Sequence, residues 1–168
     1  FADVCQSGSC VGTPDTDNFE PNNSYVGAKI EDSEDCDDLD YSLTANLYPT
    51  SDEDWYWYNH ADKNFCDVDL KVELEMPSGT NYNLCVYYEC QNGNDVDVSC
   101  DVGTKVSGPK AGVEGCCSTK SGSLKEAIQI SPSCSTGSLG DESGYVDVRV
   151  YRVSGSSCSN YTLRWGDG

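Results

Sequence analysis

Apolar and charged residues alternate without interruption from Asp67 to Met76. A period of two is typical of a β-strand that turns one face to a core and the other to solvent. A Pro-Ser-Gly turn follows at 77–79, and Tyr82 to Glu89 then alternates again. Because a short turn separates two strand patterns, the sequence predicts that these segments form a β-hairpin.

Shorter segments elsewhere carry the same pattern, and stretches rich in Gly, Ser, Pro and Asn separate them, notably 103–123 and 131–144. The additional predicted strands are Tyr41–Leu47, Trp55–Tyr58, Val96–Cys100, Leu124–Ile130, Tyr145–Val153 and Tyr161–Trp165. No segment shows a convincing helical period of 3.6 residues. About eight short strands without helices predict an all-β fold, an antiparallel β-sandwich.

The first sixteen residues differ from the remainder because they show no periodic apolar pattern. We therefore expect an N-terminal cysteine-containing extension over residues 1–16 and one β-sandwich domain over residues 17–168. A chain of 168 residues is long enough to bury a core of its own.

Eleven cysteines indicate an oxidising compartment, where thiols at this density form disulfides. We expect a mature, exported protein, secreted or at the cell surface. The candidate disulfide cysteines are Cys5, Cys10, Cys36, Cys66, Cys85, Cys90, Cys100, Cys116, Cys117, Cys134 and Cys158. An odd number leaves at least one of them without a partner in the same chain.

The spacing of the cysteines leaves their connectivity open. Cys5 and Cys10 have a spacing that suits a small local loop, and Cys85 and Cys90 repeat that spacing. The vicinal pair at 116 and 117 is expected to reach two different partners. Zinc is disfavoured, because the chain has no C-x2-C pair and only one histidine.

The formal net charge of −19 restricts the partners of this chain. An acidic surface repels phosphate backbones and anionic lipids, so we expect no nucleic acid and no membrane insertion. Cations are favoured. No G-x-S-x-G or H-E-x-x-H motif occurs, and His60 has no nucleophile at a recognisable spacing. We therefore expect that the protein is not an enzyme.

Two motifs in order resemble the bacterial pre-peptidase C-terminal (PPC) domain family. The first is the segment Asp17–Ser24 (DNFEPNNS), and the second is Ser51–Tyr58 (SDEDWYWY). Residues 76–87 (MPSGTNYNLCVY) and the segments at 144–148 and 161–163 are similar to later strands of that family. The resemblance spans roughly residues 17 to 165 and implies a jelly-roll-like, non-catalytic sandwich of exported proteins.

Relatives in that family include collagen-binding modules that hold calcium between two loops. Carried over by position, the resemblance implies metal ligands at Glu20, Asn22, Asn23, Asp52 and Asp54. Calcium prefers six to eight hard oxygen ligands, which such residues supply. The alternatives are that the first loop merely caps turns and that the two aspartates lie in a solvated loop. The acidic run Glu31–Asp40 is either a second cation site or a solvated charge run.

Aromatic residues alternate between the two faces of the strand at 55–58. The resemblance implies that Tyr56 and Tyr58 face the core. Trp55 and Trp57 then point outward, either to bind a ligand or to lie under the N-terminal extension. With Tyr87 they are the candidate binding residues.

From these observations we expect a non-catalytic, extracellular, calcium-stabilised protein that acts by binding or assembly, for example as a subunit of a surface fibre, coat or matrix. The expected partners are further copies of the chain, or an extracellular protein or polysaccharide. The alternative is a module that targets a secreted enzyme to protein fibres or polysaccharide.

Overall fold

The computed structural model describes residues 4–6, 9–11, 17–34, 41–49, 51–63, 68–91, 95–111, 113–122, 125–134, 141–155 and 159–168. Within these ranges the regular elements are strands, and no helix long and apolar enough to cross a membrane is found. The strands are β1 (Val4–Gln6), β2 (Ser9–Val11), β3 (Ala28–Lys29), β4 (Ser33–Glu34), β5 (Tyr41–Ala45), β6 (Glu53–Ala61), β7 (Leu70–Glu75), β8 (Asn81–Cys90), β9 (Val96–Val102), β10 (Thr104–Ser107), β11 (Glu114–Ser118), β12 (Lys125–Cys134), β13 (Gly144–Ser154) and β14 (Tyr161–Asp167).

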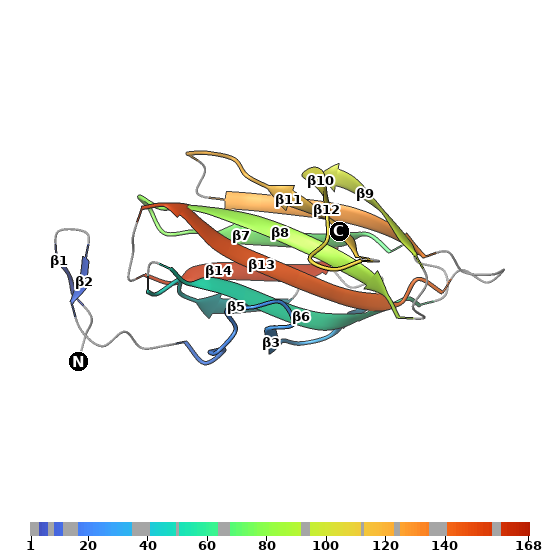
Figure 1. Cartoon of the computed structure of the whole chain (residues 1–168), viewed down its shortest axis with the longest axis horizontal. Coiled ribbons are helices and arrows are strands. Elements are labelled where there is room, and N and C mark those ends of the chain that lie inside the picture. Colours follow the sequence, from blue (N-terminus) through green and yellow to red (C-terminus); the bar gives the residue numbers. More distant parts are fainter. Residues whose placement is uncertain are drawn as a thin grey trace.

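Two sheets pack face to face as a β-sandwich (Figure 1). The seven-stranded sheet has the order β10-β11-β8-β13-β6-β3, and β4 also pairs with β6. The five-stranded sheet has the order β5-β14-β7-β12-β9. Neighbours in both sheets are antiparallel, except that β3 and β4 run parallel to β6. The predicted all-β sandwich is therefore confirmed.

The short hairpin of β1 and β2 forms a two-stranded sheet of its own and stands apart from the sandwich in Figure 1. Its register places Cys5 opposite Cys10. Thus the local approach of these two cysteines that their spacing suggested is present in the backbone.

All eight strands predicted from the alternation are found, but the predicted hairpin of β7 and β8 is wrong. β7 pairs with β12 and β14, whereas β8 pairs with β11 and β13 in the other sheet. The turn at 77–79 therefore carries the chain from one sheet to the other. The alternation of apolar and polar residues indicates that a strand has one buried face, but it does not identify the neighbouring strand. The segment 103–123, expected to be turn-rich, also contains β10 and β11.

The main core lies between the sheets and is unusually rich in tyrosine. Its large, fully buried side chains are Tyr56, Tyr58, Tyr82, Tyr88, Tyr161, Leu47, Leu70, Leu74, Leu84, Ile128, Ile130 and Leu163. The predicted core face at Tyr56 and Tyr58 is therefore confirmed. Tyrosine contributes a large apolar ring to the core, while its hydroxyl still needs a polar partner.

A second apolar cluster covers the outer face of the seven-stranded sheet, formed by Trp55, Cys85, Tyr87 and Val113. The rings of Trp55 and Tyr87 stack with centroids 5.9 Å apart. This outer cluster explains why β8 is buried on both faces along most of its length.

Three disulfides link six of the described cysteines. Cys90–Cys134 joins β8 to β12, and Cys100–Cys116 joins β9 to β11, so both connect the two sheets. Cys85–Cys117 joins the neighbouring strands β8 and β11. The prediction that the vicinal cysteines reach two partners is confirmed, whereas a bridge from Cys85 to Cys90 is excluded. Cys36, Cys66 and Cys158 lie outside the described residues.

Candidate metal centre

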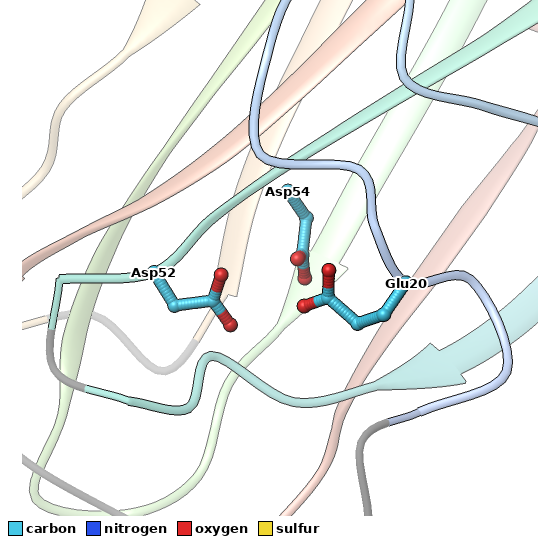
Figure 2. Close-up of side chains that lie close together, drawn as sticks. All are labelled: Glu20, Asp52 and Asp54. Carbon is cyan, nitrogen blue, oxygen red and sulfur yellow. The ribbon is translucent and has the colours of Figure 1, made fainter.

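Three carboxylates converge at one end of the sandwich, where the segment before β3 meets the start of β6 (Figure 2). Asp52 immediately precedes β6, Asp54 is its second residue, and Glu20 comes from the segment alongside. Each offers an oxygen, and these atoms lie within 4.8 Å of one another. The amide of Trp55 donates to the carbonyl of Asn22 at 2.9 Å, which ties the two segments together.

Asp54 is fully buried, and its two oxygens have different surroundings. Oδ2 accepts hydrogen bonds from the hydroxyls of Tyr161 and Tyr56, the second at 3.3 Å. The two hydroxyl oxygens also lie 2.6 Å apart, so one hydroxyl can donate to the other in place of the carboxylate. Oδ1 faces the side chain of Asn22. The tyrosines therefore fix the carboxylate from the core side and leave Oδ1 directed at the cluster.

Asp52 is only 5% exposed, and neither of its buried carboxylate oxygens accepts a well-formed hydrogen bond among the described residues, although the backbone amides of Tyr48 and Glu53 lie near enough to lower its pKa. Burying an ionised carboxylate without partners costs free energy, because the group loses its hydration and gains nothing in return. An oxygen pair of this kind is suited to a cation, which would satisfy both atoms at once.

The side-chain amide of Asn22 lies 3.2 Å from Asp54 Oδ1 and 3.1 Å from Glu20 Oε2, and its nitrogen donates to both carboxylates. If the amide turns over, its oxygen faces both carboxylates, an arrangement that needs a cation among the three oxygens. Asn22 can therefore serve the cluster in either state, as a hydrogen-bond donor or as a neutral oxygen ligand.

Glu20 and Asn23 are held together at the rim of the cluster. Glu20 Oε2 accepts from the amide of Asn22 at 3.1 Å and from the Asn23 side chain at 3.2 Å. Asn23 is exposed, and its oxygen faces the amide of Glu53 at 3.5 Å. In this arrangement Asn23 orients Glu20 and does not present its own oxygen to the cluster.

Burial and mutual repulsion dominate the electrostatics of the site. Desolvation raises the pKa of Asp52 to about 6; Glu20 and Asp17 add to the shift, and the backbone amides of Tyr48 and Glu53 oppose it. Desolvation likewise raises the pKa of Asp54 to about 8; the hydrogen bond from Tyr161 opposes this shift, and Asp52, Asp17 and Glu20 add to it. A divalent cation in the cluster would stabilise the ionised carboxylates and reverse both effects.

The sequence analysis named the three carboxylates that lie together in the structure, but it missed three other residues that interact with them. Asp17 adds its charge to the cluster while its own oxygens accept from the amides of Phe19 and Asn46, each at 3.0 Å. Tyr56 and Tyr161 complete the hydrogen bonding of Asp54. Asp17 stands three residues before Glu20 in the same motif, so its position carried a signal. The distant Tyr161, 107 residues from Asp54, carried none.

The three aromatic binding candidates do not form an exposed platform. Trp55 is 5% and Tyr87 is 7% exposed, so neither ring offers a solvent-facing binding surface. Trp55 does lie on the outer face of its strand, where Tyr25 packs against it. Neighbouring side chains of the outer cluster cover the outward sides of both rings. Trp57 alone is partly exposed, with the ammonium of Lys29 5.3 Å from its ring centre.

The acidic run has a described part and an undescribed part. Asp32 accepts from the backbone and side chain of Asn59 at 2.9 Å and pairs with Lys29 at 3.1 Å. Residues 35–40 lie outside the described ranges, so a second cation site there stays a prediction.

His60 is buried beside Ser33 where β4 pairs with β6. The hydroxyl of Ser33 lies 2.9 Å from His60 Nδ1, and both residues are less than a tenth exposed. The contact fastens the edge strand to the sheet.

A comparison with protein-family models and with curated proteins finds no match to this chain.

Proposed function

We propose that this protein is an extracellular, calcium-binding β-sandwich that acts without catalysis, by binding or assembly. The observation that carries the proposal is the convergence of Glu20, Asp52 and Asp54 around the unpartnered oxygens of Asp52. An acidic cluster alone is common on protein surfaces. A buried carboxylate whose two oxygens both lack partners is rare unless an ion satisfies them.

The chemistry of the donors favours calcium over transition metals. Three carboxylates and the amide oxygen of Asn22 are hard ligands, which calcium, magnesium and manganese prefer. Asp52 has both oxygens free, and calcium accepts bidentate carboxylates more readily than magnesium does. When bound, the ion would supply positive charge that offsets the repulsion among the carboxylates.

Two further features support an extracellular setting. Three disulfides among the described residues are typical of an oxidising compartment. The resemblance of two motifs to the PPC domain family adds the expectation of secretion and of a non-catalytic role. The net charge of −19 favours partners that are cationic or that bind through calcium.

Assembly is favoured over the targeting alternative by the aromatic residues. A targeting module was expected to bind polymer through exposed rings, and two of its three candidate rings are buried. The β1–β2 hairpin, by contrast, forms a separate two-stranded sheet that stands apart from the sandwich in Figure 1, which supports a role in contacting another molecule.

The test is the dependence of folding stability on calcium. An ion that binds only the folded state stabilises it by about 2.7 kcal/mol at a hundredfold excess over Kd. Thermal unfolding of the full chain should therefore shift upward in calcium relative to EDTA. Asp52→Asn should abolish the shift, and so should Asp54→Ala. Asp95→Asn, which changes an exposed carboxylate just before β9, is the matched control and should retain it. Equal melting temperatures of the wild-type protein in calcium and in EDTA would overturn the proposal.

A further inference from the structure

Residues 20–27 form a short segment, here called the strap, that connects the candidate metal centre to β3. The strap runs beside β6, and its two ends contact different parts of the molecule. Glu20 and Asn22 at one end belong to the carboxylate cluster. Tyr25 and Gly27 near the other end pack against Trp55.

Tyr25 reaches over the outer face of the seven-stranded sheet. Its ring meets Trp55 edge to face, with centroids 5.6 Å apart, and the ammonium of Lys110 lies 5.7 Å from the ring centre. Its hydroxyl interacts with the carboxylate of Asp147, a side chain only 4% exposed. Tyr25 therefore covers the outer cluster and contacts groups from three other parts of the chain.

The backbone of the strap is fixed on both sides of Tyr25. The carbonyl of Asn22 accepts the amide of Trp55 at 2.9 Å. A Cβ on Gly27 would lie 1.9 Å from the carbonyl oxygen of Trp55, so glycine is required for this close approach. Between them Val26 has a φ of 65°, a conformation that a β-branched residue adopts only when its surroundings impose it.

We propose that Tyr25 is a positioning residue for the candidate cation site, holding Glu20 and Asn22 in place from the outer face of the sheet. The inference rests on the proposed calcium site. Coupling between two sites is reciprocal. If Tyr25 contacts improve cation binding, then a bound cation must hold Tyr25 over Trp55 with the same free energy.

The first experiment measures calcium affinity by titration calorimetry of the full chain. Tyr25→Ala should weaken binding about 5- to 50-fold, within the usual range of coupling between sites. Tyr25→Phe, which keeps the ring and loses only the hydroxyl, should recover most of the affinity. Tyr151→Phe is the matched control. It removes a hydroxyl that accepts from Asn83 at 2.9 Å on the same face of the sheet, and it should bind calcium like the wild type.

The second experiment uses Trp55 as a reporter of the strap. In a Trp57→Phe background the remaining tryptophans are Trp55, under the strap, and Trp165, which is 2% exposed in the main core. Chelation of calcium should increase quenching by acrylamide, because Trp55 becomes accessible when the strap opens. Gly27→Ala, which pushes the strap away from Trp55, should give high quenching even in calcium.

The outcomes separate the two claims. Tight calcium binding that Tyr25→Ala leaves unchanged, with quenching that is the same in calcium and EDTA, overturns the positioning role and leaves the cation site standing. Absence of calcium binding in the wild type overturns both. Weaker binding by Tyr25→Ala, recovered by Tyr25→Phe and matched by calcium-dependent quenching, supports the inference. A uniform loss of affinity that includes Tyr151→Phe would point to general destabilisation and overturn it.

Discussion

The hydroxyl of Tyr161 donates to Asp54 Oδ2, across 107 residues of sequence and in the buried interior between the two sheets. The bond connects β14 of one sheet to β6 of the other. It also leaves Oδ1 of the same carboxylate for the candidate metal centre. The core and the site are therefore built from one hydrogen-bond network.

Removing that hydroxyl should weaken calcium binding. Tyr161→Phe should lower the affinity about 10- to 100-fold, the usual effect of losing a group that orients a metal ligand. The hydrogen bond lowers the pKa of Asp54 against the opposing effect of burial, so its loss also makes ionisation harder. Tyr82→Phe is the control for calorimetry, because the buried Tyr82 hydroxyl has no partner among the described residues. Equal affinities of the two variants would contradict the assigned role of Tyr161.

The buried Asp147 predicts a pH dependence of stability. Desolvation raises the pKa of its carboxyl to about 6; Tyr25 and Lys110 oppose the shift, and Glu89 adds to it. An aspartate in the unfolded chain has a pKa of about 3.9. Because the folded state binds this proton more tightly, its contribution to stability is complete below pH of about 4 and is lost as the pH rises through about 6.

Asp147→Asn isolates this contribution, since the amide cannot ionise. Relative to the wild type, the variant should gain up to about 3 kcal/mol of stability between pH of about 4 and 8, from a pKa difference of about two units. Urea unfolding of both proteins at the two pH values measures the change. If the difference in unfolding free energy between the two proteins stays constant with pH, then folding does not raise the pKa of Asp147.

The three described disulfides should each contribute strongly to stability. Their loops span 44, 32 and 16 residues, for which chain entropy alone gives about 3 to 4 kcal/mol per bridge. Replacing Cys90 and Cys134 together by alanine should therefore lower the unfolding free energy by about that amount in urea. Alkylation of the native protein without reductant should label at most one cysteine per chain. Labelling of three or more would contradict an oxidised framework.

The strand pattern and the site differ in how much of them sequence could predict. Alternation located all eight predicted strands because each turns one apolar face to the core. It could not reveal that β7 and β8 belong to different sheets, since partner choice depends on distant segments such as β12 and β13. The short strands β10 and β11 were hidden because Gly and Ser fill that stretch, and a tertiary disulfide at Cys116 helps to hold it.

The site followed from local motifs where its residues are close in sequence. Glu20 and Asn22 lie in one motif and Asp52 and Asp54 in another, and the resemblance supplied their convergence. The alternation placed Trp55 on the outer face of its strand but left open whether that face is solvated or covered. Tyr25 of the strap covers that face. A periodic strand pattern cannot predict that a side chain from another segment packs there.

Val26 should be replaceable with a gain in stability. Its φ of 65° is strained for a β-branched residue, and its side chain is 60% exposed, so little apolar burial is lost on replacement. Val26→Asn should stabilise the protein by about 1 kcal/mol, because asparagine tolerates the left-handed region better. Val153→Asn, at a strand position that is 53% exposed, should be neutral or destabilising instead. Urea unfolding distinguishes the two, and a loss of stability in Val26→Asn would show that the strap does not impose the strain.

Self-association through the N-terminal segment is the prediction that most directly concerns function. β1 and β2 pair with each other and, among the described strands, with no strand of the sandwich, so we predict that they add to an exposed sheet edge of a second copy. The acidic chains repel one another at a net charge of −19 each, so association should increase with calcium and with ionic strength. Sedimentation velocity of the full chain should then show oligomers whose size grows with protein concentration.

Deletion of residues 1–16 tests this contact. The core residues between the two sheets come from strands of the sandwich and the segments that join them, so the truncated protein should keep the β circular dichroism spectrum and the calcium-dependent melting of the full chain. It should sediment as a monomer under every condition. A head-to-tail contact of this kind continues into filaments unless its rotation closes a ring, so electron microscopy of the full chain should show one or the other. If the full chain stays monomeric at high concentration with calcium present, assembly is the wrong reading and binding to an extracellular polymer should be tested in its place.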